Sequence, residues 1–496
     1  MKLKVKDMDI ATGGVEIVIL NEKDAALLDM HHMDRVLVKK GSKSTIAVLN
    51  IAESKRAVPQ GRVGFFEETI DVLNAKSNDA VEIFLAKKPE SVSYIKKKLD
   101  GKELSYKETF AIVNDIVSDN LTSIELTSYV IANYTKGMTQ REIVDLTKAM
   151  KDTGNKLELK DDIIVDLHSI GGVPGNRITM IIVPIIIAAG LKMPKTSSRA
   201  ITSPAGTADT MEVFCNVDLP INKIKSIINT VGGFIIWGGA VNLAPADDKI
   251  IKIEHPLSID AEGQMLASIM AKKSSVGATH LLLEIPIGRG TKIADEKQAS
   301  HLKDHFIFLG QELGIKTVVI STDGSQPIGN GIGPVLEAID VLKVLKNDND
   351  LPNDLKVKSI SIAGLILEMV GRVKEGEGCI FATELIDSGK AYKKFLEMVH
   401  AQGGKTPDIK KLRPAKFSYN VKALKNGRIK SINNLLISKI ARIAGAPNDK
   451  AAGLYLYKHV GEVVKKGDKL FTVYSEGKEK LNYAIQASKE DHILIK

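Results

Sequence analysis

The stretch that decides the fold runs from residue 163 to residue 193 and reads IIVDLHSIGGVPGNRITMIIVPIIIAAGLKM. A run of β-branched and aliphatic residues comes first, followed by a loop with three glycines and then by a long apolar segment. This order predicts a strand, a loop and a buried helix. The apolar segment at 178–193 is shorter than the roughly 18–20 residues that span a bilayer, and Pro184 interrupts it, so we expect no membrane span.

The alternation of strand and helix continues well beyond this stretch. Such alternation builds an α/β sheet whose binding loops lie at the strand ends. We therefore predict a large α/β domain with a central mixed sheet over residues 159–410. Its further strands are expected at 233–237, 278–285, 316–320 and 359–363, and its helices at 294–313, 333–346 and within 380–399, with a break at Gly389.

The chain changes character on both sides of this domain. Residues 1–85 contain short β-branched runs that predict a β-rich domain, and residues 86–158 carry apolar residues at helical spacing. Ser105 and Thr139 are expected to cap two of these helices. Strand and hairpin patterns with one helix make residues 411–496 an α+β C-terminal domain.

The amino-acid composition indicates which kinds of binding partner the protein is expected to have. Of the 496 residues, 44% are hydrophobic and 26% are charged, which is typical of globular proteins. The net charge of +9 is spread along the chain, and aromatic residues are only 5%, so a nucleic-acid partner is not expected. The two cysteines, Cys215 and Cys379, form no zinc or disulfide spacing, and His31-His32 has no third ligand nearby. We expect a cytoplasmic protein without metal or cofactor.

Two loops carry polar groups suited to anions. Residues 166–177 join a strand to a helix, and their paired glycines let backbone amides approach an anion, although a tight turn would look the same. Residues 196–209 hold six hydroxyl side chains and Arg199, all of which can donate hydrogen bonds to phosphate oxygens. A phosphate site is the preferred interpretation of the second loop, and a solvated loop is the alternative.

A third element follows at residues 260–273. If it is helical, Gln264, Ser268 and Lys272 lie on one face, where a hydroxyl and an ammonium group could bind a base or a sugar. A solvated face for Lys272 and a helix-capping role for Asp260 are equally compatible with the pattern.

Together the three elements resemble the thymidine phosphorylase family of nucleoside phosphorylases. The family motif reads here Ser197-Ser198-Arg199-Ala200, then Gly206-Thr207-Ala208-Asp209 and Glu212. The stretches 166–173, 242–247 and 267–273 match as well. Residues 1–85 and the run Ser198–Ser203 are similar to the archaeal AMP phosphorylase branch of the family.

The resemblance implies an enzyme, a pentosyltransferase in which inorganic phosphate attacks C1′ of AMP, with CMP and UMP as further substrates. The products would be the free base and ribose 1,5-bisphosphate. Asp260 matches the proton donor of that branch. Ser169, Ser197 and Thr207 match positions that hold the attacking phosphate. The positions that match nucleotide contacts are Gly172, Ser198, Arg199, Ala200, Ile201, Thr202, Ser203, Thr207, Ser268, Lys272 and Lys292.

The resemblance also implies an architecture. Residues at about 246–276 would complete a split helical domain that faces the α/β domain, and closure of the two would bring phosphate to the nucleotide. The predicted fold class is an α/β multidomain protein with a β-rich N-terminal domain, a split helical domain, a large α/β domain and an α+β C-terminal domain. A homodimer or larger homo-oligomer is expected, with residues 1–85 as the oligomerisation domain.

Three positions depart from the family pattern. Leu167 stands where the family carries a phosphate-binding lysine, and Glu254 lies near the position of an arginine that pyrimidine enzymes direct at the base. Pro204 replaces a threonine or alanine. A pyrimidine nucleoside phosphorylase is the main alternative, followed by a phosphoribosyltransferase and by a non-catalytic scaffold.

Overall fold

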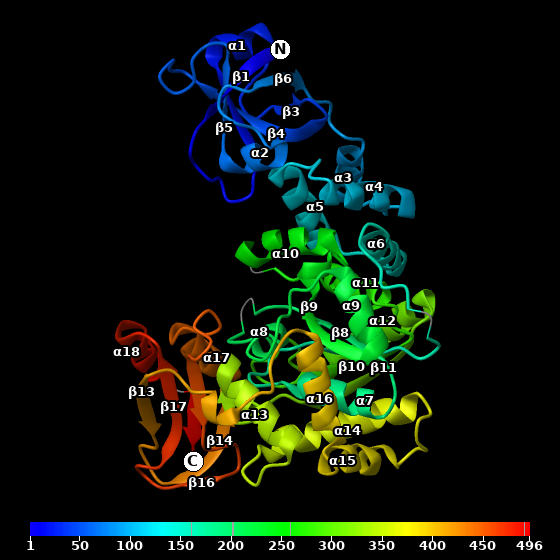
Figure 1. The fold of residues 1–496 in the computed structure, drawn as a ribbon, viewed down its shortest axis with the longest axis vertical. Coiled ribbons are helices and arrows are strands. Elements are labelled where there is room, and N and C mark those ends of the chain that lie inside the picture. The colour runs from blue at the N-terminus through cyan, green and yellow to red at the C-terminus, as the bar shows by residue number, and fades with distance from the viewer. Residues whose placement is uncertain (160, 201–202, 258, 491) are drawn as a thin grey trace. The chain divides into compact units, whose positions relative to one another are not determined.

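The computed structural model describes residues 1–159, 161–200, 203–257, 259–490 and 492–496. The chain folds into two compact units. The N-terminal unit contains residues 1–153 and 245–267, and the larger unit contains residues 154–244 and 268–496. Figure 1 colours the chain by residue number, from blue at the N-terminus to red at the C-terminus. Among the described residues, no helix is both long and apolar enough to cross a bilayer.

The first part of the N-terminal unit is a closed six-stranded barrel in the order β1-β5-β2-β4-β3-β6. Alternate residues of each strand point inward, such as Leu3 and Val5 of β1, and form the barrel core. Closure depends on the antiparallel pairing of β1 with β6, which joins the first and last strands. The elements are β1 (Lys2–Asp7), β2 (Ile17–Asn21), α1 (Glu22–Leu27), β3 (Arg35–Lys40), β4 (Lys43–Ala52), β5 (Arg62–Phe65), α2 (Glu67–Leu73) and β6 (Ala80–Leu85).

Helices make up the rest of the N-terminal unit. Capping boxes begin three of them, pairing Ser105 with Glu108, Thr122 with Glu125 and Thr139 with Glu142, so the predicted caps Ser105 and Thr139 are confirmed. The Glu142 carboxylate also forms a buried ion pair of 2.7 Å with Lys98. These helices are α3 (Ser91–Leu99), α4 (Tyr106–Val117), α5 (Ser123–Lys136), α6 (Gln140–Asp152), α10 (Pro245–Leu257) and the start of α11 (Glu262–Ser275).

Parallel strands form the core of the larger unit. The sheet β11-β10-β7 and the pair β8-β9 are parallel throughout, and a single bridge between Ile164 and Lys192 joins β7 to β8. The sequence predicted a mixed sheet; in the described residues, the antiparallel pairs of this unit lie in the C-terminal domain and at β12–β15. The strands are β7 (Val165–Ser169), β8 (Met193–Ser197), β9 (Gly233–Trp237), β10 (His280–Ile287) and β11 (Lys316–Asp323).

Helices surround these strands. The apolar segment after the first loop is α7 (Ile178–Ala188), and ten of its eleven residues are buried, as expected of a core helix. The strand predicted at 359–363 is wrong, because these residues lie inside α14 (Asn353–Met369), a long helix that packs on α7. The other elements are α8 (Thr207–Met211), α9 (Ile221–Thr230), η1 (Gly238–Val241), α12 (Glu296–Leu313), β12 (Gly331–Ile332), α13 (Pro334–Lys346), α15 (Gly378–Asp387), α16 (Lys390–Ala401) and η2 (Ile409–Lys411).

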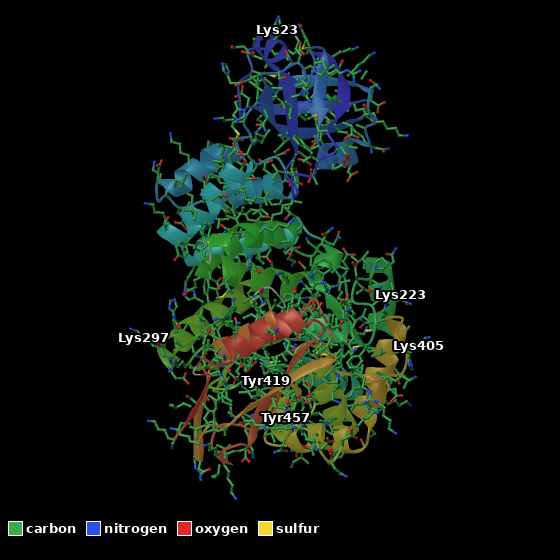
Figure 2. All side chains as sticks on the ribbon, turned by 90° about the vertical axis from the view of Figure 1, so that its left-hand side faces the viewer. Lys23, Lys223, Lys297, Lys405, Tyr419 and Tyr457 are labelled. Carbon is green, nitrogen blue, oxygen red and sulfur yellow. The ribbon has the colours of Figure 1, made fainter. Side chains whose placement is uncertain are left out.

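The C-terminal domain has its own apolar core, which includes Ile437, Leu454 and Phe471. One sheet has the order β12-β15-β17-β13, so a strand from the α/β part of the chain pairs with the C-terminal domain. Figure 2 labels Tyr419 on β13, whose side chain is exposed, and Tyr457. The elements are β13 (Phe417–Lys422), β14 (Gly427–Ile432), α17 (Asn434–Ile443), β15 (Gly453–Leu456), β16 (Val463–Val464), β17 (Lys469–Ser475), α18 (Lys478–Ala487) and β18 (Ile493–Ile495).

Candidate active site

The first predicted loop follows β7 and requires glycine at two adjacent positions. Gly171 and Gly172 have φ angles of +86° and +92°, a region that residues with side chains rarely adopt. A Cβ atom added to Gly172 would lie 2.7 Å from the backbone nitrogen of Lys292. The loop after β10 therefore packs directly on Gly172, and the fold brings together these two predicted nucleotide-contacting residues.

Ser169 ends β7, beside Glu284 of β10 in the sheet register. The Nδ2 atom of Asn176 donates to Ser169 Oγ at 3.3 Å and also reaches Glu284 Oε2 at 3.4 Å. Glu284 is fully buried and pairs with Lys358 at 2.5 Å. The Asn176 amide thus holds Ser169 at the strand end, and the ion pair of Glu284 with Lys358 orients that amide.

The hydroxyl-rich loop is closed on itself by Asp209. The Oδ2 atom of Asp209 accepts hydrogen bonds from the backbone nitrogens of Ala200 at 2.7 Å and Gly206 at 2.8 Å. Ser197 Oγ donates to the Ser198 carbonyl at 3.3 Å, Ser203 Oγ donates to the Ala205 carbonyl at 3.1 Å, and Thr207 begins α8. Ile201 and Thr202 lie outside the described residues.

Arg199 contacts protein side chains that lie within and beside this loop. Its guanidinium donates to both carboxylate oxygens of Glu212, at 2.7 and 3.0 Å, and to Asp209 at 3.3 Å. It also lies 5.2 Å from the ring centroid of Trp237. Hydrogen bonding from Arg199 lowers the pKa of Glu212 to about 2. These contacts fix the course of the loop from Arg199 to Glu212.

Arg177 clamps both loops, although the sequence did not single it out. Its buried guanidinium donates to the carbonyls of Asn176, at 2.8 Å, and Ala205, and to Thr210 Oγ1 at 3.2 Å. It also pairs with the Glu337 carboxylate, which is fully buried. One side chain thus links the first loop, the second loop and α13. Arginine is suited to this because its fork of N–H groups can satisfy several acceptors at once.

A cluster of buried charges lies beneath the strand ends. Asp166 Oδ2 accepts from Lys273 Nζ at 2.8 Å, and Lys195 Nζ lies 3.6 Å from Asp166 Oδ1. Burial and the charges of Lys273, Lys195, Lys272 and Lys292 keep the pKa of His168 well below its usual range. His168 is therefore neutral at pH 7. Lys273 ends the motif at residues 267–273, but no motif predicted a role for Lys273 or Lys195.

The third predicted element is a helix, and its polar face is as expected. Lys272 Nζ lies 3.5 Å from Ser268 Oγ, one helical turn away. The Met265 nitrogen donates to the Ala261 carbonyl at 2.9 Å at the start of α11. Asp260 directly precedes this turn and is exposed, and both of its assigned roles, helix cap and proton donor, stay predictions.

The Lys292 loop is braced by the C-terminal domain. Gly290 packs against Asn434 and Leu435 at the start of α17, and Asn434 Nδ2 donates to the Gly324 carbonyl at 2.8 Å. Thr291 Oγ1 closes the loop by donating to the carbonyls of Gly288 and Ile293. Lys292 itself is exposed at the tip.

The arrangement in the larger unit is suited to an oxyanion. Ser169 and Ser197 offer hydroxyls at neighbouring strand ends, and buried ammonium groups lie below them. His301 and His305 of α12 are one turn apart, with ring centroids separated by 4.5 Å.

Three segments match known protein families. Residues 92–154 match the helical bundle domain and residues 161–392 the α/β domain of a glycosyl transferase family, and residues 428–494 match the pyrimidine nucleoside phosphorylase C-terminal domain. Among solved structures, anthranilate phosphoribosyltransferase from Thermus thermophilus has a TM-score of 0.53 at 18% identity, covering 62% of this chain and 99% of its own. That likeness concerns the fold.

Full-length relatives define the family. The chain is 46% identical to AMP phosphorylase 1 of Archaeoglobus fulgidus, over 96% of this chain and 94% of the relative. It is 42% identical to AMP phosphorylase of Methanococcus vannielii, over 99% and 96% of the two chains. A Legionella pneumophila (strain Paris) protein, provisionally named a thymidine phosphorylase, is also 42% identical, over 99% and 95%. The chain therefore belongs to the thymidine phosphorylase family, which includes the AMP phosphorylases.

Proposed function

We propose that this protein is an AMP phosphorylase. It transfers the ribose 5-phosphate group of AMP to inorganic phosphate, releasing adenine and forming ribose 1,5-bisphosphate, with CMP and UMP as further candidate substrates. The observation that carries this proposal is the closed hydroxyl loop from Ser197 to Thr207, in a chain 46% identical to AMP phosphorylase 1 of A. fulgidus.

Inorganic phosphate is assigned to the strand ends of the larger unit. Ser169, Ser197 and Thr207 donate hydrogen bonds to its oxygens in this proposal. Hydroxyl donors and nearby ammonium groups favour a dianion over water, because charge-assisted hydrogen bonds are about twice as strong as neutral ones. No cofactor is required, since phosphate is a co-substrate.

The nucleotide is assigned to the remaining predicted residues. Lys292 is the cation for the 5′-phosphate, because it is exposed at the tip of a loop that packs on Gly172. Besides its proposed contact with the nucleotide, the Arg199 guanidinium pairs with Glu212 and so holds the backbone of the loop in place. The proposed nucleotide-contacting set is Gly172, Ser198, Arg199, Ala200, Ile201, Thr202, Ser203, Thr207, Ser268, Lys272 and Lys292.

The chemistry breaks the bond between C1′ and the base nitrogen as a phosphate oxygen bonds to C1′. Positive charge develops on the ribose and negative charge on the departing base. The phosphate dianion stabilises the first, and a proton from Asp260 neutralises the second. Asp260 is assigned this role because it matches the proton donor of the archaeal AMP phosphorylase branch and directly precedes α11, which carries Ser268 and Lys272.

A phosphorolysis assay that compares AMP with adenosine, thymidine and uridine tests the proposal. AMP should exceed adenosine in kcat/KM by at least about 10²-fold, because ligands built for the 5′-phosphate stay unpaired with a nucleoside. Equal values for AMP and adenosine would overturn the proposal. Turnover of thymidine or uridine alone would favour a pyrimidine nucleoside phosphorylase, the alternative that the match of residues 428–494 and the Legionella relative support.

The assembly and the cellular site are part of the proposal. A homodimer or larger homo-oligomer is proposed, with the barrel of residues 1–85 as the oligomerisation domain. Several apolar side chains of the barrel are exposed, including Ile10, Leu27, Met33 and Phe84. A cytoplasmic site is proposed because the spacing of the two free cysteines indicates no disulfide framework.

A further inference from the structure

Lys195 lies where two strands of the larger unit separate. Within the described part of the chain, β7 and β8 pair only at the bridge between Ile164 and Lys192. The Lys195 side chain enters the space beyond this bridge, where Nζ donates to the Leu167 carbonyl at 2.6 Å. Only 5% of Lys195 is exposed. Burial of an ammonium group is costly unless nearby negative charge compensates for it.

The charges around Lys195 are not balanced. Asp166 of β7 is the carboxylate beside it, and the Asp166 oxygens already accept from Lys273 of α11 at 2.8 Å and from the Leu167 nitrogen at 2.7 Å. His168 of β7 is neutral, and Lys272 of α11 and Lys292 add positive charge nearby. Burial and the charge of Lys273 lower the pKa of Lys195 to about 7. In the described part of the chain, the two buried ammonium groups of Lys195 and Lys273 thus share the Asp166 carboxylate.

The position of the cluster indicates what would balance it. Ser169 and Ser197 each lie five residues beyond the bridge, so the two hydroxyls stand at equivalent places on neighbouring strands. Lys195 and Leu167 are each two residues before these serines. Ligands of open α/β sheets bind at the carboxyl ends of the strands. A phosphate group bound to these hydroxyls would supply the missing negative charge.

We propose that the Lys195 ammonium is an anion ligand of this site, and that Lys195 takes up a proton from solvent when a phosphate group binds beside Ser169 and Ser197. The inference rests on the proposed function only for the identity of the anion. Lys195 then does the work that a cation at position 167 would otherwise do, since Leu167 offers only its backbone carbonyl.

Proton uptake by the wild-type protein is the first measurement. Sulfate is the probe, because it does not titrate near neutral pH as phosphate does. Isothermal titration in buffers of different ionisation enthalpy should give net proton uptake that increases from pH 6 to pH 8, because the pKa of Lys195 is lowered in the free protein. Binding of sulfate without proton uptake would overturn the proposal.

The variant Lys195→Met identifies the group that titrates. It should lose the proton uptake and bind phosphate about 10- to 100-fold more weakly, the scale of a lost hydrogen bond to a charged group. Lys223→Met is the matched control, because Lys223 is an exposed lysine of the same unit (Figure 2) and should change neither quantity. Unchanged uptake in Lys195→Met would assign the proton to another group, such as His168, and would overturn the proposal.

Two further arms separate the possible sources of the phosphate group. Titration with inorganic phosphate alone and with AMP alone shows which of them loses affinity in Lys195→Met. A loss in either arm supports the role of Lys195, and unchanged affinity in both overturns it. The outcome is independent of turnover: a protein that fails to cleave AMP but shows Lys195-dependent proton uptake would refute the proposed function and leave this inference intact.

Discussion

The Arg177 clamp can be tested by removing its charge. In Arg177→Met, the carbonyls of Asn176 and Ala205 lose this donor. Among the described residues, the Glu337 carboxylate then keeps the Gly333 nitrogen and Thr210 Oγ1 as partners. Glu337 is fully buried, and loss of one partner from a buried ion pair costs about 3–5 kcal/mol. For a unit of this size, that corresponds to a fall in melting temperature of roughly 5–10 °C.

The assay is thermal unfolding followed by circular dichroism, together with the KM for phosphate. Arg413→Met is the control, because Arg413 is exposed in the same unit and its replacement should change stability by less than about 0.5 kcal/mol. The double variant Arg177→Met/Glu337→Gln should regain at least half of the lost stability, because it removes the unpaired buried charge.

The KM for phosphate should rise in both Arg177 variants, because each of the two loops has lost an anchor. The energy assigned to the ion pair would be wrong if Arg177→Met had the same melting temperature as Arg413→Met. It would also be wrong if the double variant were no more stable than Arg177→Met. A melting point that falls without any change in KM would mean that the clamp supports the fold but does not position the loops.

Three further predictions concern other parts of the chain. Asp260→Asn should melt normally, bind AMP and lose about 10²-fold or more in turnover, the effect of a lost general acid; retained turnover would exclude that role. Deletion of residues 1–85 should reduce the number of subunits per particle in light scattering, and an unchanged particle mass would refute the assembly proposal. Burial raises the pKa of Asp340 to about 7, so the folded state holds a proton that the unfolded state releases at lower pH. Stability should therefore decrease as pH rises from about 4 to about 7, and this decrease should be absent in Asp340→Asn, as measured by urea unfolding at several pH values.

Local patterns in the sequence predicted local structure well. The caps Ser105 and Thr139 were predictable because a capping box involves residues only three apart. The break at Gly389 was equally visible, and Gly389 has a φ angle of +73° between α15 and α16. The segment 359–363 misled because serine and isoleucine alternate there as in a strand, whereas the long helix around it is set by its packing on α7.

Contacts between residues far apart in the chain could not be predicted from the sequence. Nothing near Arg177 indicates that its partner is Glu337, on a helix far along the chain. The role of Lys195 depends on where β7 and β8 separate, which residue types alone do not encode. Closure of the N-terminal barrel likewise depends on pairing between β1 and β6, at opposite ends of that domain. The motif residues could be found in the sequence, but the buried charges that support them could not.

The contacts from Gly172 through Thr291 and Gly324 to Asn434 have a consequence for protein engineering. An added Cβ atom would lie 2.8 Å from the Thr291 backbone at Gly172 and 2.7 Å from the Thr291 side chain at Gly324, and Asn434 Nδ2 donates to the Gly324 carbonyl. The Lys292 loop therefore has no slack in length, and it is not an interchangeable module. Grafting a loop of different length between Gly288 and Ile293 to alter substrate choice would require redesign of α17 in the same step. A change in the length of this loop would therefore have to be accommodated by both the α/β and the C-terminal domains.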